Sequence, residues 1–184
     1  MRTMKMHRSI AVLIAPLLLV ACWEGEPWYA TSEGQAAIPP GDYRLVEPGA
    51  PPEGDEVLRV AMNDDGSQSI TAETPWRIVS VPFGPAADRR YLVQTQKMDG
   101  KGHDDGALFL LLEVREGRYL VTVLPCGGSV RAAVERAGGF VATDPNSAST
   151  CNFTDRPLLE AELKAFLATP DRKEPDMELV RVAR

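Results

Sequence analysis

The chain of 184 residues has no apolar run long enough to span a membrane, no cluster of basic residues and only two histidines. The longest apolar run, residues 10–21, holds 12 residues, whereas a transmembrane helix needs roughly 20. The absence of any run of Lys or Arg argues against binding to nucleic acid and against electrostatic attraction to anionic lipid. The shortage of histidine limits imidazole-based catalysis and zinc binding.

The apolar run belongs to a short leader. Arg2, Lys5 and Arg8 precede it without any acidic residue, and small residues follow at its end. A basic start, a short apolar centre and small residues before a break are typical of a secretory signal peptide. Residues 1–21 are therefore predicted to be absent from the mature chain.

The residues that close this run, Leu19-Val20-Ala21-Cys22, resemble the lipobox of bacterial lipoproteins. The resemblance implies that the Cys22 thiol receives a diacylglycerol group, that signal peptidase II cuts before it, and that Cys22 becomes the acylated first residue. Because several acyl chains on one residue give stable anchoring, it also implies a cell-envelope protein anchored to a membrane by lipid, with its domain facing the periplasm or the cell exterior. The alternative is an ordinary signal peptide, cut nearby by signal peptidase I.

Removal of the leader leaves 163 residues, which is enough for one domain with a substantial core. The leader contains three of the 20 basic residues and none of the 26 acidic ones, so 17 basic residues remain and the mature net charge is −9. The acyl anchor, rather than surface charge, is expected to hold the protein at the membrane. An envelope protein or polymer is a possible partner class.

Two cysteines remain once Cys22 is assigned to lipid. In an oxidising periplasm or at a cell surface, such a pair most often forms a disulfide. Cys126 and Cys151 are therefore predicted to be bonded to each other.

Residues 22–40 are rich in Gly, Pro and small polar residues, which favours a tether between the lipid and the domain. Three aromatic residues complicate this interpretation. Trp23, Trp28 and Tyr29 are suited to the lipid interface, but Trp28 and Tyr29 are equally suited to packing on the domain. We leave both alternatives open and place the domain at residues 41–184.

Short runs of β-forming residues, separated by Gly and Asn/Asp turns, dominate the domain. Residues 108–112 are apolar at every position, as expected for a central strand covered on both faces. The predicted strands are residues 43–47, 57–62, 68–72, 76–83, 90–96, 107–115, 118–124 and 177–182.

Two helices are predicted between the strand at residues 118–124 and the last strand at residues 177–182. Apolar residues from Val130 to Ala137 recur with helical spacing, with Ser129 placed as the N-terminal cap. The second helix begins near Thr154 or Asp155, carries a Glu160–Lys164 pair and ends at Pro170. The predicted fold is therefore α+β and mainly β: an antiparallel, strongly curled or barrel-like meander sheet with two helices toward the C-terminus.

One loop offers a weak metal site. His103 lies among Asp99, Asp104 and Asp105, but these residues lack the Gly and Glu positions of a calcium-binding EF-hand loop. One histidine beside carboxylates is also too few ligands for zinc. We interpret this stretch as a polar loop between strands and expect no cofactor.

Nucleophilic catalysis has one candidate pair, Cys126 with His103, which the predicted disulfide disfavours. Any Ser-His-Asp arrangement in the mature chain would also need His103. Paired carboxylates, such as Glu113 with Glu116, resemble ordinary surface residues at strand ends. The sequence therefore favours a non-catalytic binding or assembly module. The alternative is a lipid-anchored hydrolase or small-molecule carrier, with a site in the mouth of the curled sheet lined by Trp76, Phe83 or Tyr91.

Overall fold

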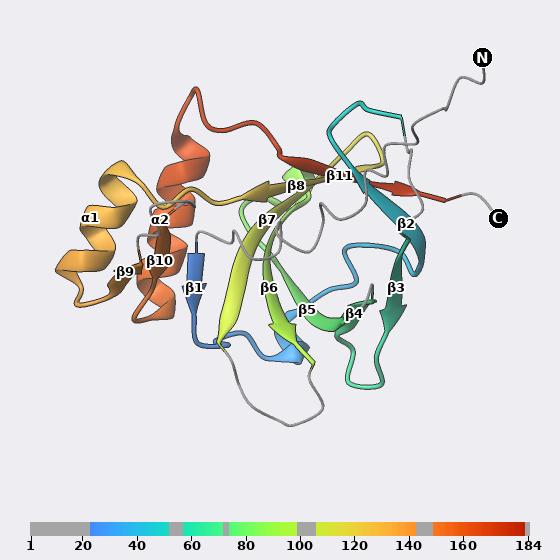
Figure 1. Ribbon diagram of the computed structural model, residues 1–184, viewed down its shortest axis with the longest axis horizontal. Helices are drawn as coiled ribbons and strands as arrows, with labels where there is room; N and C mark the ends of the chain where they lie inside the picture. Colours follow the sequence, from blue (N-terminus) through green and yellow to red (C-terminus); the bar gives the residue numbers. More distant parts are fainter. Residues whose placement is uncertain (1–22, 52–56, 72–73, 99–105, 143–148, 183–184) are drawn as a thin grey trace, which may run out of the picture.

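A closed barrel of eight antiparallel strands forms the centre of the computed structural model, which describes residues 23–51, 57–71, 74–98, 106–142 and 149–182 (Figure 1). The predicted mainly β, barrel-like architecture is confirmed. The barrel strands are β2 (Gly41–Val46), β3 (Leu58–Met62), β4 (Gln68–Thr71), β5 (Pro75–Pro82), β6 (Arg90–Lys97), β7 (Ala107–Arg115), β8 (Arg118–Val123) and β11 (Met177–Arg181).

Seven of these strands follow one another around the barrel in chain order, from β2 to β8. The last strand, β11, then pairs with both β8 and β2 and so closes the ring. Closure pairs the backbone groups of every barrel strand on both sides, which removes the exposed edges of an open sheet.

Side chains along the barrel strands alternate between the two faces of the sheet, so the protein has two separate hydrophobic cores, one outside the barrel and one in its lumen. In β7, Phe109 and Leu111 face outward into a core beneath the helices, whereas Leu112 faces the lumen. Side chains on neighbouring strand positions point to opposite faces, so a strand buried on both faces must be apolar throughout. This arrangement explains the unbroken apolar run at residues 108–112 and confirms that this strand is covered on both sides.

A smaller layer extends the sheet beyond β7 (Figure 1). The strand β1 (Trp23–Gly25) pairs with β7 where β8 has ended, and the sheet continues through β10 (Thr150–Asn152) to β9 (Phe140–Ala142). Two helices, α1 (Gly128–Arg136) and α2 (Arg156–Ala168), lie beside this layer. These three-residue strands were not predicted, since so few residues show no periodicity.

Residues 23–40 pack on the domain and do not form the expected tether. Packing on the domain was one of the two alternatives left open for Trp28 and Tyr29. Trp23 is fully buried and its indole N–H donates to the Pro125 carbonyl at 3.0 Å. The ring of Trp28 stacks on Phe109 with centroids 5.5 Å apart. Large aromatic side chains gain more by burial than a solvated linker allows.

Helix ends follow the predictions in one case and differ in the other. The second helix begins where predicted, and the carboxylate of Asp155 caps α2 by accepting the Leu158 N–H at 2.8 Å. At α1 the cap is Gly127, and Ser129 lies inside the helix instead. The predicted partner of Glu160 is also wrong, because Glu160 accepts hydrogen bonds from Arg156 and Tyr29.

A disulfide lies between the barrel and the added layer. The sulfur atoms of Cys126 and Cys151 are 1.99 Å apart, and the two Cα atoms are 5.4 Å apart. The bond joins the chain leaving β8 to β10 and encloses α1. The predicted pairing is therefore present in the structure.

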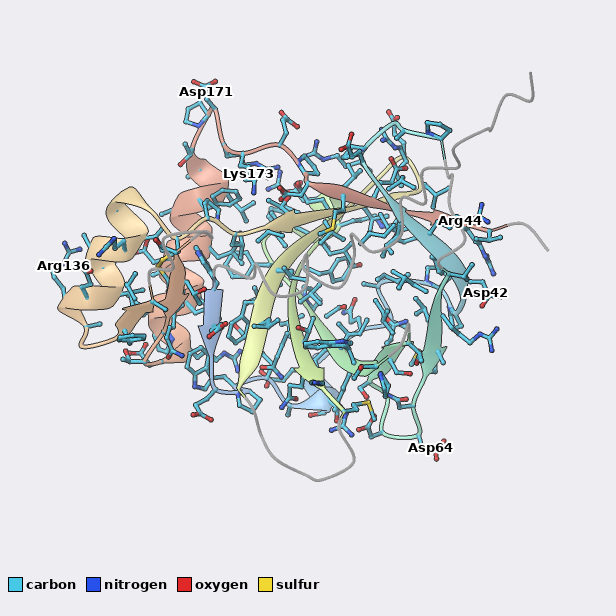
Figure 2. The ribbon with its side chains drawn as sticks, viewed as in Figure 1. Asp42, Arg44, Asp64, Arg136, Asp171 and Lys173 are labelled. Atoms are coloured by element: carbon cyan, nitrogen blue, oxygen red, sulfur yellow. A yellow bond between two sulfur atoms is a disulfide. The ribbon has the colours of Figure 1, made fainter. Side chains whose placement is uncertain are left out.

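Charged side chains gather at the periphery, and Figure 2 shows Asp64, Arg136 and Asp171 at the outer edges of the molecule. Among the described residues, no helix is both long enough and apolar enough to cross a bilayer.

Candidate ligand site in the barrel lumen

The lumen of the barrel contains a cavity of about 80 Å³. Most barrel strands contribute inward-facing side chains to its wall, and the segment before β2 adds one more. The lining residues are Ile38, Ile70, Trp76, Ile78, Val93, Thr95, Leu110, Leu112, Val121 and Leu179.

The lining extends over two layers of side chains. On β5 the lining residues are Trp76 and Ile78, two positions apart, and β6 and β7 each contribute a pair with the same spacing. Residues two apart on a strand lie on the same face, about 7 Å from each other. The cavity wall therefore runs along the strands and not only around one ring of the barrel.

None of the described lining residues is titratable, and the one polar side chain among them already has a partner. The hydroxyl of Thr95 donates to the Leu108 carbonyl at 3.4 Å. A polar ligand group placed here would leave its hydrogen bonds with water and gain none, which costs about 1–3 kcal/mol. The cavity is therefore chemically suited to hydrocarbon.

A segment from before β2 completes the wall beside the start of β4. Gln35 forms an antiparallel bridge with Ser80 on β5, and its N–H donates to the Ser80 carbonyl at 2.8 Å. Three residues later, Ile38 enters the lumen. The buried amide of Gln68 holds the backbone of Ile38, donating to its carbonyl and accepting from its N–H. This polar side chain closes the wall without adding an unpaired group to the cavity.

The lumen is bounded at one end by Trp76, which is partly exposed. Its cross-strand partner is Lys97, the last residue of β6, and Lys97 is exposed. Residues directly opposite on antiparallel strands share a face. Lys97 therefore lies on the lumen side of the sheet, next to the indole.

Glu113 forms a second, purely polar cluster on the outer face of β7. The residue is 1% exposed, and its carboxylate accepts hydrogen bonds from Arg172 at 2.8 and 2.9 Å, Arg115 at 2.8 Å and Arg90 at 3.2 Å. Burial alone would raise the pKa of Glu113, but the hydrogen bonds from Arg172 and Arg115 outweigh it and hold the pKa below its usual value. Both carboxylate oxygens of Glu113 have donors, whereas Nη1 of Arg172 is buried without a hydrogen-bond partner among the described residues. The many donors around one carboxylate are typical of a structural network.

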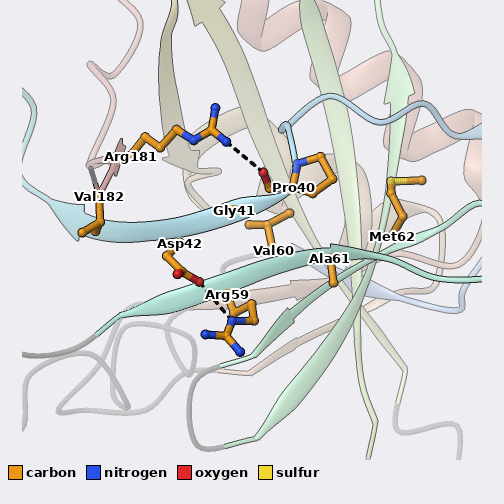
Figure 3. Close-up of a pocket in the computed structure, with 9 residues that line it drawn as sticks. All are labelled: Pro40, Gly41, Asp42, Arg59, Val60, Ala61, Met62, Arg181 and Val182. Carbon is orange, nitrogen blue, oxygen red and sulfur yellow. Dashed lines mark hydrogen bonds and ion pairs between the residues drawn. The ribbon is translucent and has the colours of Figure 1, made fainter. Parts of the chain in front are cut away.

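An open hollow of about 800 Å³ lies along β2, β3 and the end of β11 (Figure 3). Its guanidinium groups are engaged within the hollow itself. Arg59 Nε is 3.0 Å from a carboxylate oxygen of Asp42, and Arg181 donates to the Pro40 carbonyl at 3.3 Å. The remaining lining residues are Gly41, Val60, Ala61, Met62 and Val182.

Several predicted site residues lie outside the described part of the chain. Cys22, the lipidation candidate, and the weak metal candidates Asp99, His103, Asp104 and Asp105 are all in this group. Within the described ranges, no group of three or more His, Cys, Asp or Glu side chains is arranged to hold a metal ion.

The three aromatic residues that were predicted to line a pocket lie in different parts of the structure. Trp76 lines the cavity, Tyr91 packs on the lumen core without lining it, and Phe83 belongs to the outer core. No described carboxylate converges on the cavity. Cys126 is bonded to Cys151 and so is not a free nucleophile in this structure.

The position of Lys97 was not predicted, although the sequence contains a signal for it. Thr95 and Lys97 are two apart at the end of a strand, and such residues share a face. The part played by Ile38 had no such signal, because it precedes β2 and shows no strand periodicity.

Comparisons with protein-family models, curated proteins and solved structures found no match for this chain.

Proposed function

We propose that this protein is a lipid-anchored, non-catalytic envelope protein that binds a small apolar ligand in its barrel lumen. The observation that carries the proposal is the lumen cavity, with nine apolar lining residues and a tenth, Thr95, whose hydroxyl is already bonded to backbone. Barrels of eight strands are at the size where the lumen is either filled by side chains or holds one small ligand.

Energetics favour an occupant. An empty cavity costs roughly 24 cal/mol per Å³, so about 80 Å³ corresponds to about 2 kcal/mol of lost stability. A hydrocarbon group that fills the space restores the lost dispersion contacts. Its own transfer out of water is also favourable, by about 0.8 kcal/mol per buried CH₂. Water restores neither, because an apolar wall offers it no hydrogen bonds.

The membrane anchor in this proposal rests on the lipobox resemblance of Leu19-Val20-Ala21-Cys22. Cleavage before Cys22 would keep every described residue, from Trp23 onward, in the mature chain. The anchor would place the barrel beside a bilayer, which is a reservoir of hydrocarbon ligands.

Assembly with another envelope protein is the second candidate. It is favoured by Phe140, which is 69% exposed on β9. Within the described residues β9 pairs only with β10, so its other edge carries backbone groups suited to strand addition.

The lumen proposal is tested with 1-hexanol, a neutral ligand with a short chain. The lipid-anchored protein is placed in nanodiscs of uncharged phospholipid and titrated in a calorimeter, with empty nanodiscs subtracted. We expect saturable binding with a negative heat-capacity change, which marks burial of apolar surface. Val93→Phe should abolish binding by filling the cavity, and Val93→Leu should weaken it.

The matched control is Met62→Phe, which adds the same ring at a position that is 44% exposed. It should bind 1-hexanol as the wild type does. Binding that survives Val93→Phe unchanged, in a variant with a wild-type circular dichroism spectrum, would place the ligand elsewhere and refute the proposal.

A further inference from the structure

The end of the lumen bounded by Trp76 combines an apolar wall with a cation. Lys97 is opposite Trp76 in the β5–β6 register and two residues beyond the lining residue Thr95. Both relations place Lys97 on the lumen side of the sheet. It is exposed, and it forms no ion pair with any residue in the described ranges.

The volume of the lumen restricts the shape of the ligand group that can be buried there. A cavity that accepts a benzene ring has a volume of about 150 Å³, whereas the lumen has about 80 Å³. A ring is therefore too large, while the end of an unbranched chain, which extends along the two layers of lining side chains, fits.

The lining of the lumen also restricts the polarity of the buried part of the ligand. No charged side chain of the described ranges lines the cavity, and the Thr95 hydroxyl is already bonded to the Leu108 carbonyl. A polar head group therefore has no partner among the described lining residues, and at the Trp76 end the described lumen face carries a cation, Lys97. The apolar interior and the cation at its end are suited to the two parts of one amphiphile.

We propose that the ligand is a single-chain amphiphile with an anionic head group. The end of its unbranched alkyl chain occupies the lumen, and its head group lies beside Trp76 and pairs with the Lys97 ammonium. This inference rests on the proposed ligand function of the lumen. The shared chemistry is an anionic head on an alkyl chain, and the source of the anion is a carboxylate or a phosphate.

The expected head-group effect is modest. Exposed ion pairs contribute little, and their range corresponds to a preference of about two- to five-fold for the anionic ligand. The preference should decrease as salt is added, because exposed charges are screened. Each methylene added to the chain should tighten binding about four-fold until the cavity is full.

The test compares four probes on the lipid-anchored protein in uncharged nanodiscs: hexanoate, hexyl phosphate, 1-hexanol and cyclohexanol. Empty nanodiscs give the blank for each. We expect hexanoate or hexyl phosphate to bind two- to five-fold more tightly than 1-hexanol, and cyclohexanol to bind more weakly than 1-hexanol. The tighter of the two anions identifies the head group.

Two variants test whether Lys97 causes the preference for the anionic ligand. Lys97→Gln should remove the anion preference and leave 1-hexanol binding unchanged, whereas Lys164→Gln, a matched change at an exposed position on α2, should retain the preference. An anion preference that persists in Lys97→Gln, or is absent in the wild type, would overturn this inference while 1-hexanol binding upholds the lumen site. Failure of 1-hexanol to bind would overturn both, and cyclohexanol binding as tight as 1-hexanol would overturn the unbranched shape.

Discussion

Glu113 is the residue whose environment departs most from what its sequence position indicates. It precedes a hairpin, where acidic residues are usually solvated, and yet three arginines surround its buried carboxylate. Two of the three come from β6 and β7, and Arg172 comes from the segment after α2, 59 residues away. Contacts at this separation are set by the fold and cannot be read from local spacing.

We predict that Glu113→Gln lowers the free energy of unfolding by about 3 kcal/mol at pH 7, because it leaves the arginines around a buried site without their anion. Chemical denaturation of the variant and the wild type measures this difference. Glu116→Gln, at an exposed position of the same hairpin, should change stability by less than about 0.5 kcal/mol.

The same carboxylate should make stability depend on pH. Because its folded pKa is lowered, its contribution is present above the unfolded pKa of about 4.3 and is lost as pH falls through the folded value. The difference between wild type and Glu113→Gln should therefore shrink in acid. A difference that stays constant down to pH 2 would contradict an ionised Glu113.

At the scale of elements, the barrel strands were largely predictable and the added layer was not. The strand at residues 107–115 was predicted with its observed bounds, because apolar residues and flanking Gly mark it clearly. Strand β1 has only three residues, and its partners β7 and β10 are far along the chain. No local pattern indicates such a pairing.

The cavity was predictable only in part. Trp76 was named, with Phe83 and Tyr91, as lining the site of the alternative function, and of these three only Trp76 lines the cavity. Whether space remains inside the barrel depends on the summed volumes of side chains from seven separate segments, including Ile38. A sequence pattern gives the inward-facing positions but not the space left between them.

The structure of the N-terminal segment gives a sharp prediction. Trp23→Ala should destabilise the domain by about 3–5 kcal/mol, the usual cost of truncating a buried Trp, because the ring contacts Phe153 at 4.9 Å between centroids. Ser32→Ala, at an exposed position in the same segment, is the control. A stability change near zero for Trp23→Ala would restore the tether interpretation.

At the scale of the whole molecule, the proposed lipid anchor would hold the closed barrel beside a membrane. We predict that Cys22→Ser prevents lipidation, so that metabolically supplied labelled palmitate is incorporated into the wild type but not the variant. Ser9→Ala, in the leader, should leave labelling unchanged. Equal labelling of wild type and Cys22→Ser would exclude Cys22 as the acylated residue.

The central claim, that the lumen holds an apolar chain, is tested most directly by locating a bound ligand. Nuclear Overhauser effects are measured between protonated 1-hexanol and methyl-labelled, otherwise deuterated protein in nanodiscs. The account predicts contacts from the terminal methyl of the ligand to Ile78, Val93 and Leu112, which face the lumen. Contacts confined to methyl groups of the outer core, such as those of Leu159 and Leu163, would contradict it.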